Sequence, residues 1–291
     1  MKSVQPSGLR PVTQGMRWML LIASGLVFIV GIQLFILTEY TERYFAWTIK
    51  PPLTAAFLGA GYWASFAMEY MASRKRLWAH ARIAVPAVLI FTTLTLVATL
   101  LHLDRFHLSD PNLLTRVAAW VWLAVYAIVP LTMASLLVLQ MRVPGDDPPR
   151  TAPLPRWIHA ILIVHALVML PLGAALFLAP QATAPLWPWT LTPLTGRAVG
   201  AWLLALGVAA AHSSWENDWQ RVHIATISYT VLGGFQLLGL IRYPQVVDWS
   251  RPSAWLYVVF LVSVLLVGLY GWRQSARTAS TGTLPAQASA A

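Results

Sequence analysis

Long runs of apolar residues, divided by short polar segments, constrain this sequence more than any other feature. A helix needs about 20 residues to cross the roughly 30 Å hydrocarbon layer of a membrane. Helices are expected in these runs because backbone N–H and C=O groups in hydrocarbon must bond to one another. We expect eight spans, at residues 18–38, 53–73, 83–103, 114–140, 157–179, 196–213, 222–241 and 254–272. The sequence therefore predicts an all-α, polytopic membrane protein with eight transmembrane helices.

The composition agrees with a location in the membrane. Hydrophobic residues make up 58% of the chain and charged residues only 10%, which leaves too little polar surface to cover a soluble globule. The formal net charge is +10, but the basic residues lie in short loops, where they orient a membrane chain rather than bind nucleic acid. The chain has no cysteine, which excludes disulfides and thiolate ligands, so a metal or haem would need His, Met or carboxylate ligands.

The second half of the sequence repeats the first half weakly but in register. Trp78 and Trp219 are 141 residues apart, and the same offset relates Gly59 to Gly200. A proline-rich segment, residues 142–156, lies between the two copies. Because each copy holds an even number of expected spans, both copies enter the membrane in the same direction. The eight helices are therefore expected as two parallel four-helix repeats.

This division predicts five segments. They are a cytoplasmic N-terminal segment 1–16, a first transmembrane repeat 17–141, a cytoplasmic linker 142–156, a second repeat 157–272 and a disordered cytoplasmic tail 273–291. The tail lacks the bulky apolar residues that would offset the entropy lost on ordering. With the N-terminus inside, 13 of the 20 Lys and Arg residues fall on the cytoplasmic side. We therefore expect both termini to be cytoplasmic, and the Arg-rich composition favours a bacterial inner membrane.

Two structural features recur at matching positions of the copies. Small residues one helical turn apart, Ala55 with Gly59 and Gly196 with Gly200, favour close helix packing, which we place near the pseudo-twofold axis between the copies. Tryptophan at the end of a span is typical of the belt at a membrane–water interface. The sequence predicts such belts at Trp47, Trp78, Trp120, Trp189, Trp219 and Trp255.

Polar residues at membrane depth are the candidates for function, above all where the copies differ. Glu69 aligns with Ala210. A carboxylate at this depth is costly unless it reaches water, forms an ion pair or is protonated. A surface ion pair with the basic run 74–76 is the favoured interpretation, and a proton or cation site is the alternative. The acids Glu216 and Asp218 are expected in a solvated turn.

Four histidines fall on one side of the membrane, and His165 with either His212 or His223 is the combination to test. Haem b held between helices needs two axial histidines that face each other at the same depth. His165 is expected roughly 12 Å below the start of its helix, and His212 near the surface, so the depths match poorly. We therefore expect no cofactor, with haem b as the one alternative and hydrogen-bonded histidines as the simpler interpretation.

The span 222–241 carries a polar stripe in which Tyr229 and Gln236 lie on one helical face. Such a face turns from lipid towards protein, because unpaired hydroxyl and amide groups in hydrocarbon cost several kcal/mol. The stripe could line a pocket for a lipid, a quinone or a small solute, or it could form hydrogen bonds between helices.

No signature of a catalytic site is present, so an enzyme is not favoured. The best hypothesis is a protein that binds or transports a lipid or small solute in a pocket between the repeats. Its candidate ligand-binding residues are Glu69, His165, His212, Tyr229 and Gln236. A membrane-embedded haem or quinone oxidoreductase and a structural assembly partner are the alternatives. The expected partner is the lipid bilayer, and not nucleic acid.

Overall fold

The computed structural model describes the backbone of residues 8–281, and in that part of the chain helices account for nearly all the ordered structure. Seven of the helices are long and apolar enough to cross a membrane within the described residues. They are α1 (Gln14–Gly31, continued by the π-helical turn η1, Ile32–Ile36), α4 (Ala84–Leu101), α5 (Leu113–Met141), α6 (Arg156–Leu178), α8 (Pro193–Glu216), α9 (Trp219–Arg242) and α10 (Pro252–Thr281). The protein is thus all-helical, with the composition and helix lengths of a multi-pass membrane protein.

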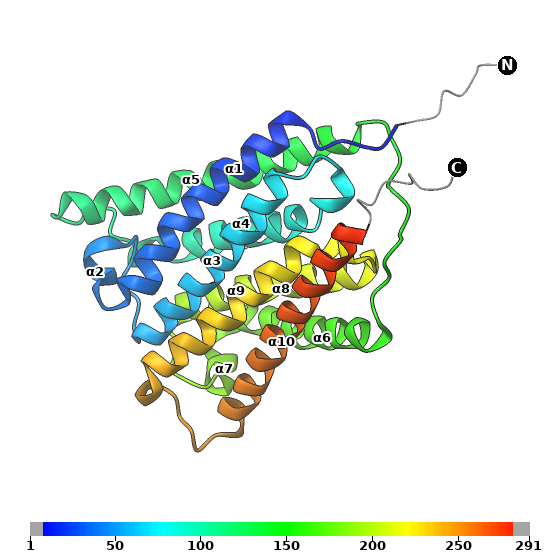
Figure 1. Ribbon diagram of the computed structural model, residues 1–291. Coiled ribbons are helices and arrows are strands. Elements are labelled where there is room, and N and C mark those ends of the chain that lie inside the picture. The colour runs from blue at the N-terminus through cyan, green and yellow to red at the C-terminus, as the bar shows by residue number, and fades with distance from the viewer. Residues whose placement is uncertain (1–7, 282–291) are drawn as a thin grey trace, which may run out of the picture.

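The remaining long helix, α3 (Pro52–Ser73), has 22 residues but is not among the seven helices that are apolar enough to cross a membrane. The expected count of eight spans is therefore met only in part. Most residues of α3 are buried, and Figure 1 shows it between α1 and α9, which both pack against it. A helix enclosed by other helices contacts little lipid, so it tolerates the Gly, Ala, Ser and Tyr residues that lower its hydropathy.

Short elements occupy the connections between the long helices. Two are single-turn α-helices, α2 (Thr41–Tyr44) and α7 (Pro180–Thr183). The others are 3-10 turns, η2 (Thr38–Tyr40), η3 (Trp78–His80), η4 (Leu103–Arg105), η5 (Ala184–Leu186) and η6 (Pro244–Val246).

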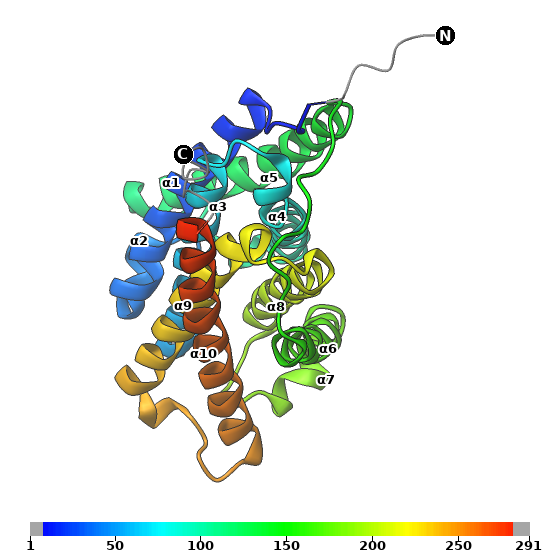
Figure 2. The same cartoon turned by 45° about the vertical axis from the view of Figure 1, so that its right-hand side comes forward.

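The long helices pack in a pattern that is similar in the two halves of the chain, which we define as residues 8–141 and 156–281. In the first half α1 packs on α3 and α4 packs on α5, while in the second half α6 packs on α8 and α9 packs on α10. The halves meet where α3 packs on α9 and where α4 packs on α8 (Figures 1 and 2). The buried residues of both halves form one continuous hydrophobic core.

Glycines at two helix crossings allow close approach, as the small-residue pattern predicts. A Cβ atom on Gly59 would lie 2.6 Å from the backbone N of Phe35, and one on Gly200 would lie 2.8 Å from the N of Phe177. These crossings join α3 to η1 and α8 to α6, so each lies inside one half. The expected position near the axis between the halves is therefore wrong.

The expected tryptophan belt is found at only two of its six positions. Trp120 and Trp255 are exposed, whereas the other four are buried: Trp47, Trp78, Trp189 and Trp219. Trp47, Trp78 and Trp189 lie in the connections between long helices, and Trp219 is the first residue of α9. Trp189, for example, donates its indole N–H to the hydroxyl of Thr54 at 2.9 Å, which ties a loop of the second half to α3.

One end of the helix bundle gathers the first described residues, the linker 142–155 and the end of α10 (Figure 1), and we call it the linker end. The segment before α1 is fixed there by backbone hydrogen bonds. Arg10 N donates to Asp146 O of the linker at 2.9 Å, and Val12 N donates to Arg76 O at 2.8 Å. The segment before α1 thereby joins the linker to the α3–α4 connection at this end.

Candidate functional site

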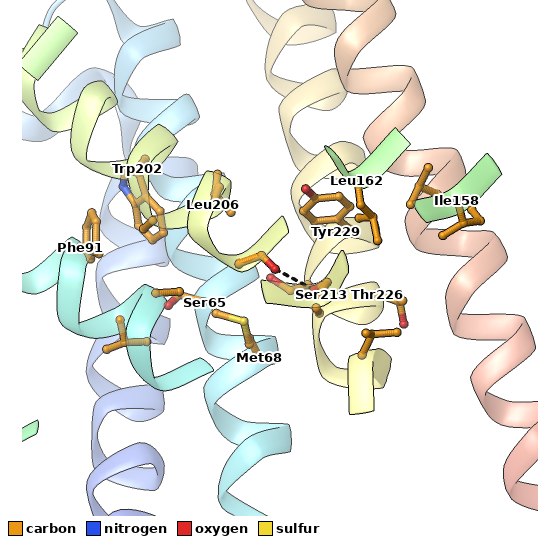
Figure 3. A pocket seen from close by; sticks show the side chains of 18 of the residues that line it. Ser65, Met68, Phe91, Ile158, Leu162, Trp202, Leu206, Ser213, Thr226 and Tyr229 are labelled. Atoms are coloured by element: carbon orange, nitrogen blue, oxygen red, sulfur yellow. Dashed lines mark hydrogen bonds between the residues drawn. The ribbon is translucent and has the colours of Figure 1, made fainter. Parts of the chain in front are cut away.

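A narrow crevice lies where α3 and α4 of the first half meet α6, α8, α9 and α10 of the second half. The cavity inside it has a volume of only about 30 Å³, so its walls are nearly in contact. Figure 3 shows Ser65, Met68, Phe91 and Trp202 on one side of it, with Ile158, Leu162, Thr226 and Tyr229 on the other. Most of the lining is aliphatic or aromatic, so the crevice suits an apolar occupant.

Most hydroxyl groups that line the crevice already have partners within the protein. Ser213 donates to the carbonyl of Ala209 at 2.7 Å, which is the dashed line in Figure 3. Ser228 donates to the carbonyl of Ala64 at 2.9 Å, and Ser65 and Thr226 also donate to protein atoms. The hydroxyl of Tyr229 differs, because it is buried and has no hydrogen-bond partner. Tyr229 is thus the predicted site residue that both lines the crevice and offers it an unused polar atom.

His165 lies beside Tyr229, with the two ring centroids 5.7 Å apart, but it does not line the crevice. Its Nε2 atom is 2.7 Å from the Oγ of Ser263, which donates its own hydrogen to the carbonyl of Phe260. When Ser263 donates to Phe260 in this way, Nε2 carries the proton and donates to Ser263. The other ring nitrogen, Nδ1, is then an acceptor, and it is buried without a partner.

Gln236 forms hydrogen bonds between helices and does not line the crevice. Its side-chain amide donates to the carbonyl of Phe57 on α3 at 3.0 Å, and its amide oxygen accepts from the hydroxyl of Tyr257 on α10 at 2.9 Å. At this end of the polar stripe, the polar side chain forms hydrogen bonds between helices, as one of the two interpretations of the stripe expects.

Glu69, on α3, is buried, with only 1% of its surface exposed. Its Oε1 accepts a hydrogen bond from Ser65 at 2.6 Å, while Oε2 is buried without a partner. Among the described residues no ion pair involves Glu69, so the favoured interpretation of a surface ion pair is wrong. The reason is the position of α3: its last turns are enclosed by other helices, so the carboxylate does not reach the surface.

His212 belongs to a separate group of charged side chains at the linker end. Its Nε2 lies 3.3 Å from Oε1 of Glu216, a carboxylate that has no exposed surface. Glu216 also forms ion pairs with Arg82 of the first half and with Arg221 of α9, the latter at 2.9 Å. Asp147 of the linker lies 2.6 Å from Arg82. We call Arg82, Asp147, Glu216 and Arg221 the ion cluster.

The expectation of a solvated turn around Glu216 is therefore wrong. Asn217 ends α8 in the left-handed conformation, with φ of 46°, and its side chain accepts from the N–H of Leu154 in the linker at 3.1 Å. Asp218 caps the start of α9 by accepting from the N–H of Gln220 at 2.9 Å, and its other oxygen accepts from the N–H of Ala152 at 2.9 Å. The turn is thus buried beneath the linker that it binds.

The structure does not unite the five predicted site residues at one place. Tyr229 and His165 are in ring contact, while Glu69, Gln236 and His212 have separate partners. Sequence analysis missed the ion cluster, although Glu216 and Arg82 are charged residues that adjoin predicted spans in a chain with only ten acidic residues. That scarcity is the signal that could have directed attention to it.

No group of three or more His, Cys, Asp or Glu side chains within the described part of the chain could hold a metal ion. The histidines weighed for haem contact other side chains: His165 contacts Ser263, His212 contacts Glu216 and His223 contacts Lys75. The arrangement combines an apolar crevice, lined by one buried hydroxyl that has no hydrogen-bond partner, with a buried ion cluster that joins the two halves.

Comparison of the chain with protein-family models, with curated proteins and with solved structures finds no match.

Proposed function

We propose that the crevice between the halves of this membrane protein opens to bind a mostly apolar molecule with a single hydrogen-bonding group, such as a lipid or a quinone. The observation that carries the proposal is the buried hydroxyl of Tyr229, which lines an apolar space and has no partner. A buried polar group without a partner costs about 1–3 kcal/mol. An occupant that accepts a hydrogen bond from Tyr229 removes that cost.

The lining residues support a crevice that straddles the two halves symmetrically. Adding the repeat offset of 141 to four lining residues of the first half gives four lining residues of the second half. The pairs are Ser65 with Leu206, Met68 with Ala209, Ala87 with Ser228, and Val88 with Tyr229. The free hydroxyl thus occurs where the two copies differ, as is expected if one half changed its lining to hold a polar group.

The first test is the identity of the molecules that co-purify with the protein, by mass spectrometry of an organic extract. Tyr229→Phe should lower the bound amount about two- to tenfold through the loss of one hydrogen bond. Ala209→Phe should lower it further, because the added ring fills the crevice. The matched controls are Tyr40→Phe and Ala124→Phe, which change exposed positions elsewhere and should leave binding unchanged.

Equal occupancy in wild type, Tyr229→Phe and Ala209→Phe would reject the crevice as the site. An absorption spectrum of the same preparation tests the oxidoreductase alternative. A Soret band that disappears on replacing His165 or His212 would favour haem binding over the present proposal.

For the architecture we propose eight spans arranged as two parallel four-helix repeats, with α3 as the eighth span and both termini in the cytoplasm of a bacterium. In the proposed repeat α3 corresponds to α8, and α4 corresponds to α9. The contacts between the halves support this correspondence, since α3 packs on α9 and α8 packs on α4. The chain has no cysteine, so single cysteines can be introduced without background labelling. Thr48→Cys should react with an impermeant thiol reagent from outside, and Arg76→Cys only after the membrane is permeabilised. Labelling of both positions from one side would show that α3 does not cross.

A further inference from the structure

Three residues of the α3–α4 connection, at the linker end, match residues at the α8–α9 turn and the start of α9 when the repeat offset is added. Adding 141 to positions 75, 80 and 82 gives 216, 221 and 223, so Lys75 matches Glu216, His80 matches Arg221, and Arg82 matches His223. This is the offset that also relates Trp78 to Trp219.

The repeat offset relates one contact between the halves to a second contact. The first contact is an ion pair, and the second is a contact between two bases. Arg82 of the first half is paired with Glu216 of the second half. In the matching contact, Nζ of Lys75 lies 3.3 Å from Nδ1 of His223. The carboxylate of the first contact has thus been replaced by an ammonium group, while the backbone arrangement that brings the two positions together is kept.

The resulting group of Lys75, His80 and His223 has no acidic partner of its own. No carboxylate lies within ion-pair distance of these three residues in the part of the chain that the structure describes. Asp218 and Glu216 are close enough to influence His80, but both carboxylates already accept hydrogen bonds from other groups. Lys75 therefore carries a positive charge without an ion-pair partner in the described residues, beside two imidazole rings.

Burial lowers the pKa of the Lys75 ammonium, and burial together with the charge of Lys75 lowers the pKa of His80. Both shifts have the sign expected of basic groups that are partly buried. All three side chains are half-buried, so water and solutes can still reach them.

We propose that Lys75, His80 and His223 form a binding site for a phosphate group. The Lys75 ammonium donates to Nδ1 of His223, which leaves Nε2 of that ring as an N–H donor and leaves two further donors on the lysine. Phosphate oxygens accept several charge-assisted hydrogen bonds at once, and Lys is a common phosphate ligand. The exposed Arg74 and Arg76 flank the group and add to the positive potential. The phosphate can come from the headgroup of an anionic lipid or from a soluble phosphate compound.

The test uses the full-length protein in detergent, with inorganic phosphate measured by calorimetry and phosphatidic acid measured by native mass spectrometry. Diacylglycerol, which lacks the phosphate, is the lipid control. Lys75→Gln should weaken binding about tenfold or more, since it removes a charged donor. Arg142→Gln removes an exposed base outside the group and should leave binding unchanged.

A double variant keeps the test independent of folding. Lys75→Glu with His223→Arg copies the Arg82–Glu216 pair into the matching contact, so the protein should stay folded and lose phosphate binding. Loss of binding to both probes supports a site for phosphate from either source, loss for phosphatidic acid alone identifies the lipid headgroup, and loss for inorganic phosphate alone identifies a soluble ligand. Absence of binding in wild type, or equal binding in wild type and the double variant, would overturn the proposal.

Discussion

Replacement of Glu216 by alanine tests whether the ion cluster holds the two halves together. Glu216 accepts from Arg82 of the first half and from Arg221 of the second half, and its side chain is 0% exposed. The two arginine side chains are themselves only 12% and 5% exposed. Glu216→Ala therefore leaves two positive charges in a confined space with Asp147 as their only remaining acidic partner in the described ion pairs.

The expected loss of stability is large for one substitution. Removal of one partner from a buried ion pair typically costs about 3–5 kcal/mol, because the remaining charge stays buried without compensation. Asp147 is 28% exposed and still contacts both arginines, which places the expected loss near the lower end, at about 3 kcal/mol. The linker would then provide the only carboxylate between the halves at this position.

The loss can be measured by reversible unfolding of the purified protein in mixed micelles. Asp248→Ala serves as the matched control, since Asp248 forms an exposed pair with Arg251 and its removal should leave the unfolding midpoint unchanged. A double-mutant cycle with Arg82→Ala isolates the interaction between Arg82 and Glu216, and a coupling energy of more than about 1 kcal/mol is expected. The reasoning is refuted if Glu216→Ala costs less than about 1 kcal/mol, because a buried pair should not behave like a surface pair.

Three further predictions concern the pH dependence of stability, helix packing and the crevice. The pKa of His80 lies below its ordinary value of 6.5, because burial and the charges of Lys75 and Arg221 outweigh Asp218 and Glu216. As the pH falls, His80 is therefore protonated in the unfolded chain before it is protonated in the folded protein. Unfolding measurements should show stability falling as the pH drops below about 6.5, and the fall should be smaller in His80→Gln. Gly59→Ala should cost about 1–3 kcal/mol in the same assay because its Cβ meets backbone of the neighbouring helix, whereas Gly25→Ala, at a position with open space, should be neutral. Tyr229→Phe should stabilise the delipidated protein, by removing an unpaired hydroxyl, and a destabilised variant would contradict its role in the empty crevice.

The positions of most long helices follow from the sequence because hydrocarbon thickness sets the length of an apolar run. The expected span 114–140 is observed as α5, Leu113–Met141, and the expected span 157–179 as α6, Arg156–Leu178. The end of the first helix was less predictable. The apolar run continues to residue 38, but the α-helix ends at Gly31 and a π-helical turn follows. Hydropathy records only that these residues avoid water, and does not distinguish the two helical forms.

The surroundings of the polar residues could not be predicted in the same way. Glu69 was expected to pair with bases a few residues away, because sequence reasoning weighs close neighbours first. Its buried position depends on packing by helices from both halves of the chain. Glu216 likewise finds Arg82 across 134 residues, so no local pattern shows that the carboxylate is buried. Tertiary contacts of this kind decide whether a charge at the end of a span reaches water.

The proposed duplication gives the differences between the halves a common physical meaning. A twofold arrangement of identical units would form every contact between the halves twice, with the same two residue types each time. Val88 and Tyr229 match across the crevice, and one of them now carries a free hydroxyl. Lys75 and Glu216 match at the linker end, and the exchange of sign leaves one contact as an ion pair and the other as two bases. If divergence of the copies created both binding sites, then restoring symmetry should remove them: Tyr229→Val should empty the crevice, and the paired substitution at Lys75 and His223 should abolish phosphate binding, each without loss of the fold.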